Sequence, residues 1–233
     1  MIVFIFYLNK FFIMSGGVEN LVFTLNDLKF KLPFGMIIAG SSLSGKTTFL
    51  LKMLNDLKNL IVPLPVEIVY AYGEYNEAIP FLRQNGIKVV SGLPSEEFID
   101  SCKKPLLLIL DDLLTYASEK YLQNLFTKKA HHNNIGIIFI TQNLFDKNVR
   151  VARKNTHYII LTRAPNSALD ISNIGRQLFP GKLDYFMDAY NQATDEQYGY
   201  LITDMHPSTN KALRLRTRIF EGELQEVFIP KKA

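Results

Sequence analysis

The chain has 233 residues, of which 48% are hydrophobic and 21% are charged, with a formal net charge of +4. This length holds one α/β domain with a modest appendage, and the composition excludes an intrinsically disordered chain. The single cysteine, Cys102, excludes an intrachain disulfide framework and a cysteine-based zinc site, and it fits a reducing compartment. The mild positive charge is compatible with nucleic acid as a partner without establishing one.

Residues 1–13 are almost all apolar. They are shorter than the roughly 20 residues that span a bilayer, and they lack the basic start and small-residue cleavage site of a signal peptide. We therefore expect neither stable membrane insertion nor secretion. Met14 is a natural starting residue, so residues 1–13 are either an upstream extension missing from the mature protein or an added strand or hydrophobic anchor. We divide the chain into this extension and one domain, residues 14–233.

Predicted strands alternate with predicted helices along most of the chain. The first strands are expected at 21–25, as an edge strand, and at 33–40, as a short buried strand that ends in a glycine. Apolar residues at helical spacing predict a helix over 47–60. Later apolar runs are continuous, as in parallel strands covered on both faces. The later strands are expected at 66–71, 106–110, 136–140 and 157–161, with helices at 118–130 and 170–178.

The last third of the chain has a different pattern. Residues 198–203 and 212–219 alternate between apolar and polar, and the segment 207–210 carries turn residues. This pattern predicts an antiparallel hairpin at the edge of a mostly parallel α/β sheet. The same region is rich in basic residues, which we read as a possible contact with nucleic acid. These residues are Lys211, Arg214, Arg216, Arg218, Lys231 and Lys232.

A segment between the second strand and the first helix matches G-x-x-x-x-G-K-[ST] in full. Glycines let such a loop curl so that its N–H groups point at phosphate oxygens, and the following helix offers its positive end. Lys46 is expected to reach the β- and γ-phosphates, and the Thr47 hydroxyl to hold Mg²⁺. The flanking strand and helix favour this P-loop over a glycine-serine surface turn. The predicted nucleotide-binding residues are Gly40, Ser41, Ser42, Leu43, Ser44, Gly45, Lys46, Thr47 and Thr48.

Two carboxylates follow the apolar run 106–110. Asp111 is expected to bind Mg²⁺, directly or through its water. Asp112 is expected to polarise an attacking water as a general base, although it is one methylene shorter than the Glu of many such ATPases. The alternative is that this pair only caps the next helix.

A polar side chain also ends the strand predicted at 136–140. If this strand lies between the P-loop strand and the carboxylate strand, Gln142 faces the γ-phosphate or the attacking water; a capping role is the alternative. A neighbouring subunit often supplies an arginine that stabilises transition-state charge. Arg150, Arg153 and Arg163 are the candidates, with Arg153 preferred, and a solvated basic face is the alternative for each.

Several other site types are disfavoured. The sequence contains neither the Asn/Thr-Lys-x-Asp nor the Asp-x-x-Gly motif of GTPases, no Leu-Ser-Gly-Gly-Gln signature, and no clear arginine-rich kinase lid. His131 and His132 are adjacent, so on a helix they point in different directions, and they are better explained as a helix-end pair than as a metal site.

Together these segments resemble the DNA-packaging ATPases of the FtsK/HerA superfamily. The resemblance rests on the P-loop, on the Leu-Leu-Leu-Ile-Leu-Asp-Asp run that ends at Asp112, and on residues 132–143, which end in Thr-Gln-Asn. It is greatest to the poxvirus-type enzymes of large DNA viruses and of Polinton/Maverick or adintovirus-like elements. Residues 153–155 and 198–216 are similar too, and the similarity spans about residues 34–220.

The resemblance implies a P-loop NTPase of the ASCE type, which has an additional strand and a catalytic Glu or Asp. It implies a ring-shaped homo-oligomer that uses ATP and Mg²⁺ to move double-stranded DNA into a preformed capsid, with capsid proteins as partners, in the host cytoplasm or nucleus. Lys46 and Thr47 would serve nucleotide and metal, Asp111 and Asp112 metal and catalysis, and Gln142 sensing. No single arginine matches the finger position. A nucleotide-dependent switch is the alternative, because Asp112 replaces Glu, and a small-molecule kinase is a third.

Overall fold

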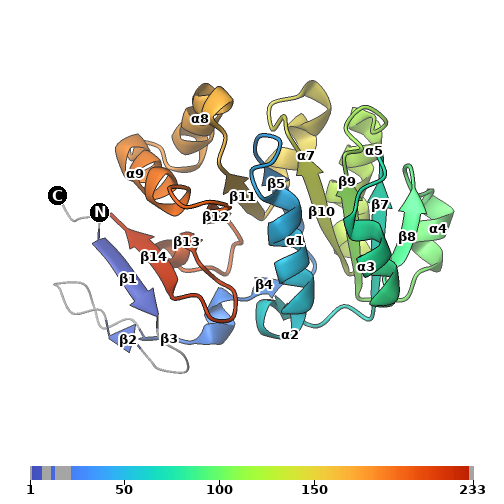
Figure 1. The fold of residues 1–233 in the computed structure, drawn as a ribbon, viewed down its shortest axis with the longest axis horizontal. Coiled ribbons are helices and arrows are strands. Elements are labelled where there is room, and N and C mark those ends of the chain that lie inside the picture. Colours follow the sequence, from blue (N-terminus) through green and yellow to red (C-terminus); the bar gives the residue numbers. More distant parts are fainter. Residues whose placement is uncertain (1, 7–11, 14–21, 231–233) are drawn as a thin grey trace.

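The computed structural model describes residues 2–6, 12–13 and 22–230. Among these residues, one ten-stranded sheet runs in the order β1-β14-β13-β12-β11-β5-β10-β9-β7-β8 (Figure 1). The strands from β11 to β8 are parallel, and Phe139 of β10 pairs with both Ile37 of β5 and Leu110 of β9. The parallel strands are β5 (Gly35–Ala39), β7 (Glu67–Tyr72), β8 (Lys88–Ser91), β9 (Leu106–Asp111), β10 (Ile135–Thr141) and β11 (Tyr158–Thr162).

Antiparallel strands extend the sheet beyond β11. β12 (Tyr200–Asp204) and β13 (Leu215–Thr217) form the predicted C-terminal hairpin. Sequence analysis missed β14 (Gln225–Ile229), which pairs with β13, because its start is polar and it has too few residues for a clear alternation. β1 (Ile2–Phe6) pairs with β14 at the edge. The predicted α/β class, with a mostly parallel sheet and an antiparallel C-terminal hairpin, is confirmed.

The expected edge strand at 21–25 is shorter than predicted and lies outside the main sheet. β3 covers Val22–Phe23 and pairs with β2 (Phe12–Ile13) in a separate two-stranded sheet. The chain then enters a 3-10 helix, Leu25–Leu28, where the backbone N–H and the hydroxyl of Thr24 both donate to Asp27. This local hydrogen bonding competes with strand pairing. The other parts of the predicted N-terminal extension, residues 1 and 7–11, lie outside the described residues.

Both faces of the central parallel strands β5, β9, β10 and β11 are buried, which explains their continuous apolar runs. Met36 and Ile38 of β5 point to one face, and Ile37 and Ala39 to the other. The first face is covered by α1 (Lys46–Asn55), α2 (Leu57–Leu60) and α3 (Ala78–Gln84). The helices on the second face are α4 (Glu96–Ser101), α5 (Glu119–Gln123) with its continuations, α7 (Arg150–Lys154), α8 (Ala168–Leu178) and α9 (Leu183–Ala193).

Smaller elements complete the fold. β4 (Phe30–Lys31) and β6 (Ile61–Val62) form a short parallel pair. The helix predicted at 118–130 begins at α5 and continues through the π-helical segment η2 (Asn124–Lys129) to α6 (Ala130–His132), so its end carries the predicted histidine pair. Further 3-10 turns lie at Lys147–Val149, Pro165–Ser167 and Lys211–Leu213. Within the described part of the chain, no helix combines the length and apolar character that crossing a membrane requires.

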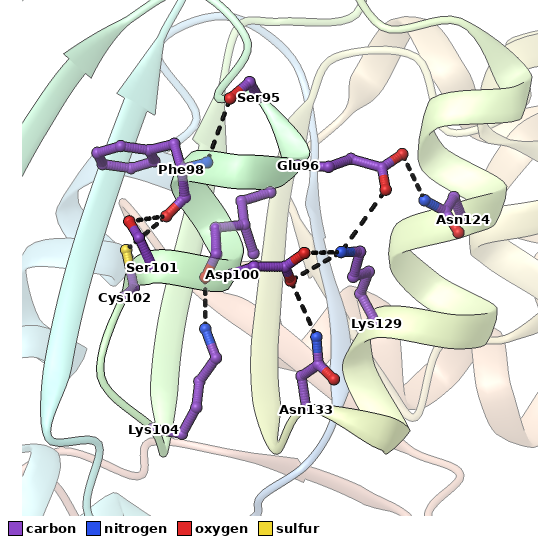
Figure 2. A network of polar contacts seen from close by, with 11 residues as sticks. Ser95, Glu96, Phe98, Asp100, Ser101, Cys102, Lys104, Asn124, Lys129 and Asn133 are labelled. Carbon is purple, nitrogen blue, oxygen red and sulfur yellow. Dashed lines mark hydrogen bonds and ion pairs between the residues drawn. The ribbon is translucent and has the colours of Figure 1, made fainter.

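A polar network joins α4 to the helical segment beside it (Figure 2). Asp100 accepts hydrogen bonds from the Lys129 ammonium, at 2.7 and 2.5 Å, and from the Asn133 amide at 3.1 Å. Asn124 donates to Glu96 at 2.7 Å. Cys102 is buried at the end of α4, where its thiol donates to the Phe98 carbonyl, as expected of a small structural residue.

A buried ion pair joins the two strands of the C-terminal hairpin. Arg216 of β13 donates to Asp204 of β12 at 2.8 Å, and both side chains are 0% exposed. Among the described residues, two other guanidinium nitrogens of Arg216, Nε and Nη1, have no hydrogen-bond partner. The Asp204 carboxylate is therefore the main partner of the buried Arg216 charge, and its loss would leave that charge unpaired.

We predict that Asp204→Ala lowers the free energy of unfolding by about 3–5 kcal/mol, the range for breaking a buried pair from one side. Urea denaturation monitored by circular dichroism measures this. Asp100→Ala is the matched control: it removes a carboxylate that is half exposed and paired with Lys129, so about 0–1 kcal/mol is expected. Equal destabilisation by the two substitutions would contradict the importance of the Arg216–Asp204 pair.

Candidate active site

The P-loop, residues 40–45, joins β5 to α1 in the middle of the sheet. Gly45 adopts φ 98°, a left-handed conformation that glycine accepts without strain. Gly40 lies so close to β11 that an added Cβ would be 1.9 Å from the Thr162 hydroxyl oxygen. Both glycines of the motif are thus required by the local geometry, as the sequence pattern predicts.

Thr162, at the end of β11, supports the loop from one side. Its hydroxyl lies 2.6 Å from the Ser44 hydroxyl and donates to the Ala39 carbonyl at 3.2 Å. Ser44 also donates to the Ser41 carbonyl at 2.7 Å. Sequence analysis did not single out Thr162, although a polar residue that ends an apolar run was the available signal.

Lys46 begins α1 and folds over the loop. Its ammonium donates to the carbonyls of Gly40 and Ser41, at 2.9 and 2.7 Å. Burial lowers the pKa of Lys46, while the charges of Asp111 and Asp112 oppose that shift. The ammonium therefore lies within the electrostatic influence of both carboxylates, between the phosphate loop and the end of β9.

Asp111 ends β9 and is 8% exposed. Tyr70, on the neighbouring strand β7, donates its hydroxyl to Asp111 Oδ2, and Asn76 donates to the Tyr70 oxygen at 2.8 Å. Burial raises the pKa of Asp111, and the hydrogen bond from Tyr70 opposes this shift. Burial, followed by the charge of Asp111, raises the pKa of Tyr70, so the hydroxyl keeps its proton and remains a donor.

Sequence analysis missed both Tyr70 and Asn76. A tyrosine inside a buried strand needs a partner for its hydroxyl, which was the available signal. The partner itself could not be inferred, because it depends on β7 lying next to β9 in a register that pairs Tyr70 with Ile109.

Asp112 is exposed and adopts φ 52° immediately after the strand. Its carbonyl oxygen packs against Gly73, where an added Cβ would lie 2.1 Å from it. The next helix, α5, is capped by Ser118, which accepts from the Tyr121 N–H at 3.2 Å. The alternative of a helix cap is therefore wrong for Asp112, while its catalytic role stays a prediction.

Gln142 follows β10, and β10 lies between the P-loop strand and the carboxylate strand, as expected. The Ser42 hydroxyl of the P-loop donates to Gln142 Oε1 at 3.0 Å. The turn itself is held by Thr141, whose hydroxyl accepts from the Asn143 N–H at 3.1 Å. The 3-10 helix that follows is capped by Asp146 rather than by Gln142. The structure thus brings Gln142 to the phosphate loop.

The candidate arginines take different positions. Arg153 donates to the Leu144 carbonyl at 2.7 Å, and its guanidinium carbon lies 4.1 Å from the centroid of the Phe145 ring. Arg153 is therefore held by the segment that follows β10. Arg163 follows β11, and its carbonyl accepts from the Ser41 N–H at 3.4 Å. Arg150 is exposed at the start of α7. An arginine acting on a neighbouring subunit stays a prediction.

The donors predicted for Mg²⁺ suit that ion. Thr47 is exposed in the first turn of α1, and Asp111 lies at the end of β9, where its charge acts on Lys46. A hydroxyl and a carboxylate are hard oxygen donors, and Mg²⁺ commonly takes one or two such ligands together with waters and substrate phosphates. Among residues 2–6, 12–13 and 22–230, no cluster of three or more His, Cys, Asp or Glu side chains is arranged to hold a metal ion.

Comparison with known proteins agrees with this geometry. No protein-family model and no curated protein matches the chain significantly. Solved structures that resemble it include the genome packaging NTPase B204 of Sulfolobus turreted icosahedral virus 2 in complex with ATP-gammaS. That likeness has a TM-score of 0.52 and 16% identity, and it covers 79% of this chain and 96% of B204.

The same NTPase in complex with AMPPCP has a TM-score of 0.50 and 17% identity over the same shares of the two chains. EssC of Geobacillus thermodenitrificans is a weaker match, with a TM-score of 0.48, 14% identity, and coverage of 92% of this chain and 43% of EssC. At these identities the B204 likeness establishes the fold. The predicted P-loop fold is confirmed, with an additional strand, β10, between the P-loop strand β5 and the carboxylate strand β9.

We predict that Tyr70→Phe lowers nucleotide hydrolysis about tenfold and raises the Mg²⁺ concentration needed for half-maximal rate. The substitution removes a hydrogen bond to a charged carboxylate, an interaction of about 1.5–3 kcal/mol, and frees Asp111 to turn away. Phosphate release measured across a Mg²⁺ titration tests this.

Tyr158→Phe is the matched control for this prediction. Tyr158 is also a buried tyrosine on a central strand, and its hydroxyl accepts from the Lys31 N–H at 3.1 Å. Among the described residues, this hydroxyl makes no hydrogen bond to the P-loop or to Asp111. Equal effects of the two substitutions on the Mg²⁺ dependence would show that Tyr70 acts only through general stability.

Proposed function

We propose that this chain is an ATP-hydrolysing motor of the FtsK/HerA superfamily that moves double-stranded DNA, in genome packaging into a preformed capsid. The observation that carries the proposal is the contact between Ser42 of the P-loop and Gln142 at the tip of the intervening strand β10. It puts an amide beside the phosphate loop, next to the strand that ends in Asp111 and Asp112. This arrangement suits attack on the γ-phosphate by water rather than by a substrate hydroxyl.

Each residue of the site has a defined task in this proposal. Lys46 would give up its hydrogen bonds to the loop carbonyls and bind the β- and γ-phosphates. Thr47 and Asp111 would hold Mg²⁺. When bound, the ion neutralises charge that develops on the phosphate oxygens. Asp112 accepts the proton of the attacking water. Gln142 orients that water or senses the γ-phosphate.

The DNA partner is supported by the fold shared with B204, described as a genome packaging NTPase. It is not supported by all of the basic residues near the C-terminus. Arg216 is fully buried against Asp204, so the expectation that this arginine meets DNA is wrong. Arg218 is paired with Glu196 and Glu226, and its contact with DNA stays a prediction. A ring-shaped homo-oligomer, capsid partners, and an assembly site in the host cytoplasm or nucleus belong to the same proposal.

The first test is ATP hydrolysis by the full chain with and without linear double-stranded DNA. We expect DNA to stimulate turnover, and Lys46→Ala to lower it by about 100-fold or more, the scale for removing one group that stabilises transition-state charge. Lys58→Ala is the matched control, because Lys58 is an exposed lysine on α2.

DNA binding should also weaken steeply as salt is raised, since contacts to phosphates release counterions. Fluorescence anisotropy of a labelled duplex at several salt concentrations measures this. A chain that neither binds DNA nor hydrolyses ATP faster with DNA at low salt would contradict the motor.

Asp112 separates the motor from a nucleotide-dependent switch. As a general base it should matter by about 10²–10⁴-fold in rate, so we expect Asp112→Ala to reduce hydrolysis on that scale while leaving ATP binding intact. Single-turnover hydrolysis together with a binding titration gives both quantities. An unchanged hydrolysis rate with intact binding would favour the switch, because the shorter carboxylate would then have no catalytic part.

A further inference from the structure

A cavity of about 210 Å³ lies between α1 and the segment that leads into β12. This volume is below the roughly 300–1,000 Å³ of pockets that enclose a drug-sized ligand, so it suits one ring system rather than a whole nucleotide. The lining side chains used below are Thr48, Phe49, Tyr198, Tyr200, Arg218 and Phe220.

The cavity continues directly from the P-loop. Thr48, in its wall, follows the predicted metal ligand Thr47 on α1. Tyr198, also in its wall, packs on the last glycine of the loop: a Cβ added at Gly45 would lie 2.9 Å from both Cβ and Cδ1 of Tyr198. A molecule whose phosphates lie in the loop would therefore have this cavity as its neighbour.

The direction of a bound nucleotide follows from the strand order. Two groups are expected at the terminal phosphate: Gln142, which follows β10, and Asp111, which ends β9. Both strands lie on one side of β5. The cavity lies on the other side, toward β12 and β13, which Figure 1 shows to the left of α1. A nucleotide whose γ-phosphate points to β9 and β10 must send its base away from them, toward the cavity.

The chemistry of the cavity suits an aromatic base. Tyr198 is 48% exposed, which leaves part of its ring open for stacking. Buried aromatic rings form the wall behind it: Phe49 packs edge-to-face on Tyr200 at 4.8 Å and on Phe220 at 5.2 Å between ring centroids. Base stacking on such rings depends on the π-face and needs no particular edge contact.

The segment that carries Tyr198 is held in place by the C-terminal strands. Arg218 donates to Glu196 at 2.7 Å and to Glu226 of β14 at 3.0 Å. The Thr217 hydroxyl of β13 donates to the Tyr200 carbonyl at 2.6 Å. These bonds fix both ends of the segment, so the cavity wall is formed before any ligand binds.

We propose that this cavity binds the base of the nucleotide whose phosphates occupy the P-loop, with Tyr198 as the stacking residue. The inference rests on the proposed function, since it assumes a nucleotide in the loop, and it adds the residues that recognise the base. The C-terminal hairpin is then part of the nucleotide site as well as an extension of the sheet.

Isothermal titration calorimetry of the full chain with Mg·ATP and with Mg·tripolyphosphate tests this proposal. Tripolyphosphate has the phosphates but no base, so the native chain should bind ATP more tightly. Tyr198→Ala should weaken ATP binding about tenfold and leave tripolyphosphate binding unchanged, whereas Tyr198→Phe should keep the native preference. Phe81→Ala, which removes an exposed ring on α3 away from the cavity, is the matched control.

The outcomes separate this proposal from the function on which it rests. Equal affinity of the native chain for ATP and tripolyphosphate, or equal loss of both ligands in Tyr198→Ala, would overturn the base site while leaving the phosphate site in place. Failure of the native chain to bind either ligand would contradict the proposed function itself, and this inference with it.

Discussion

The position of the P-loop strand between two other parallel strands is the constraint on which the site depends. β5 has β11 on one side and β10 on the other, and each of these strands ends in a polar residue beside the loop. From β11 the Thr162 hydroxyl meets Ser44 at 2.6 Å, and from β10 the Gln142 amide meets Ser42 at 3.0 Å. The loop is thus braced from both sides, and the close approach to Thr162 leaves no room for a side chain at position 40.

Burial at the end of β9 in this sheet disfavours the charged form of Asp111. A carboxylate at the end of an entirely buried strand loses hydration, which disfavours its charged form. The Tyr70 hydroxyl, itself hydrogen-bonded by Asn76, offsets part of that loss and directs the carboxylate. Lys46 adds an opposite charge nearby. The site therefore combines a buried, oriented carboxylate, Asp111, with an exposed one, Asp112, which suits separate tasks in metal binding and proton transfer.

The antiparallel half of the sheet has a structural role that could not be predicted from its basic residues. Its basic residues suggested a contact with nucleic acid. However, Arg216 forms a buried ion pair with Asp204, and Arg218 forms hydrogen bonds that hold the segment before β12. That segment carries Tyr198 onto the last glycine of the P-loop. The added strands consequently shape the surroundings of the phosphate loop from the side opposite Gln142.

The fold class, the phosphate loop and the carboxylate pair could be predicted from local sequence patterns. The P-loop motif reflects the backbone geometry of the loop itself, and a continuous apolar run reflects a strand that is buried on both faces. The polar tip at Gln142 could also be inferred, once an intervening strand was assumed. Tyr70, Asn76, Thr162 and Tyr198 could not be assigned, since each acquires its partner from a segment distant in the chain through strand order and register. The pairing of Arg216 likewise depended on β12 and β13 lying side by side, which brings a buried charge to its carboxylate.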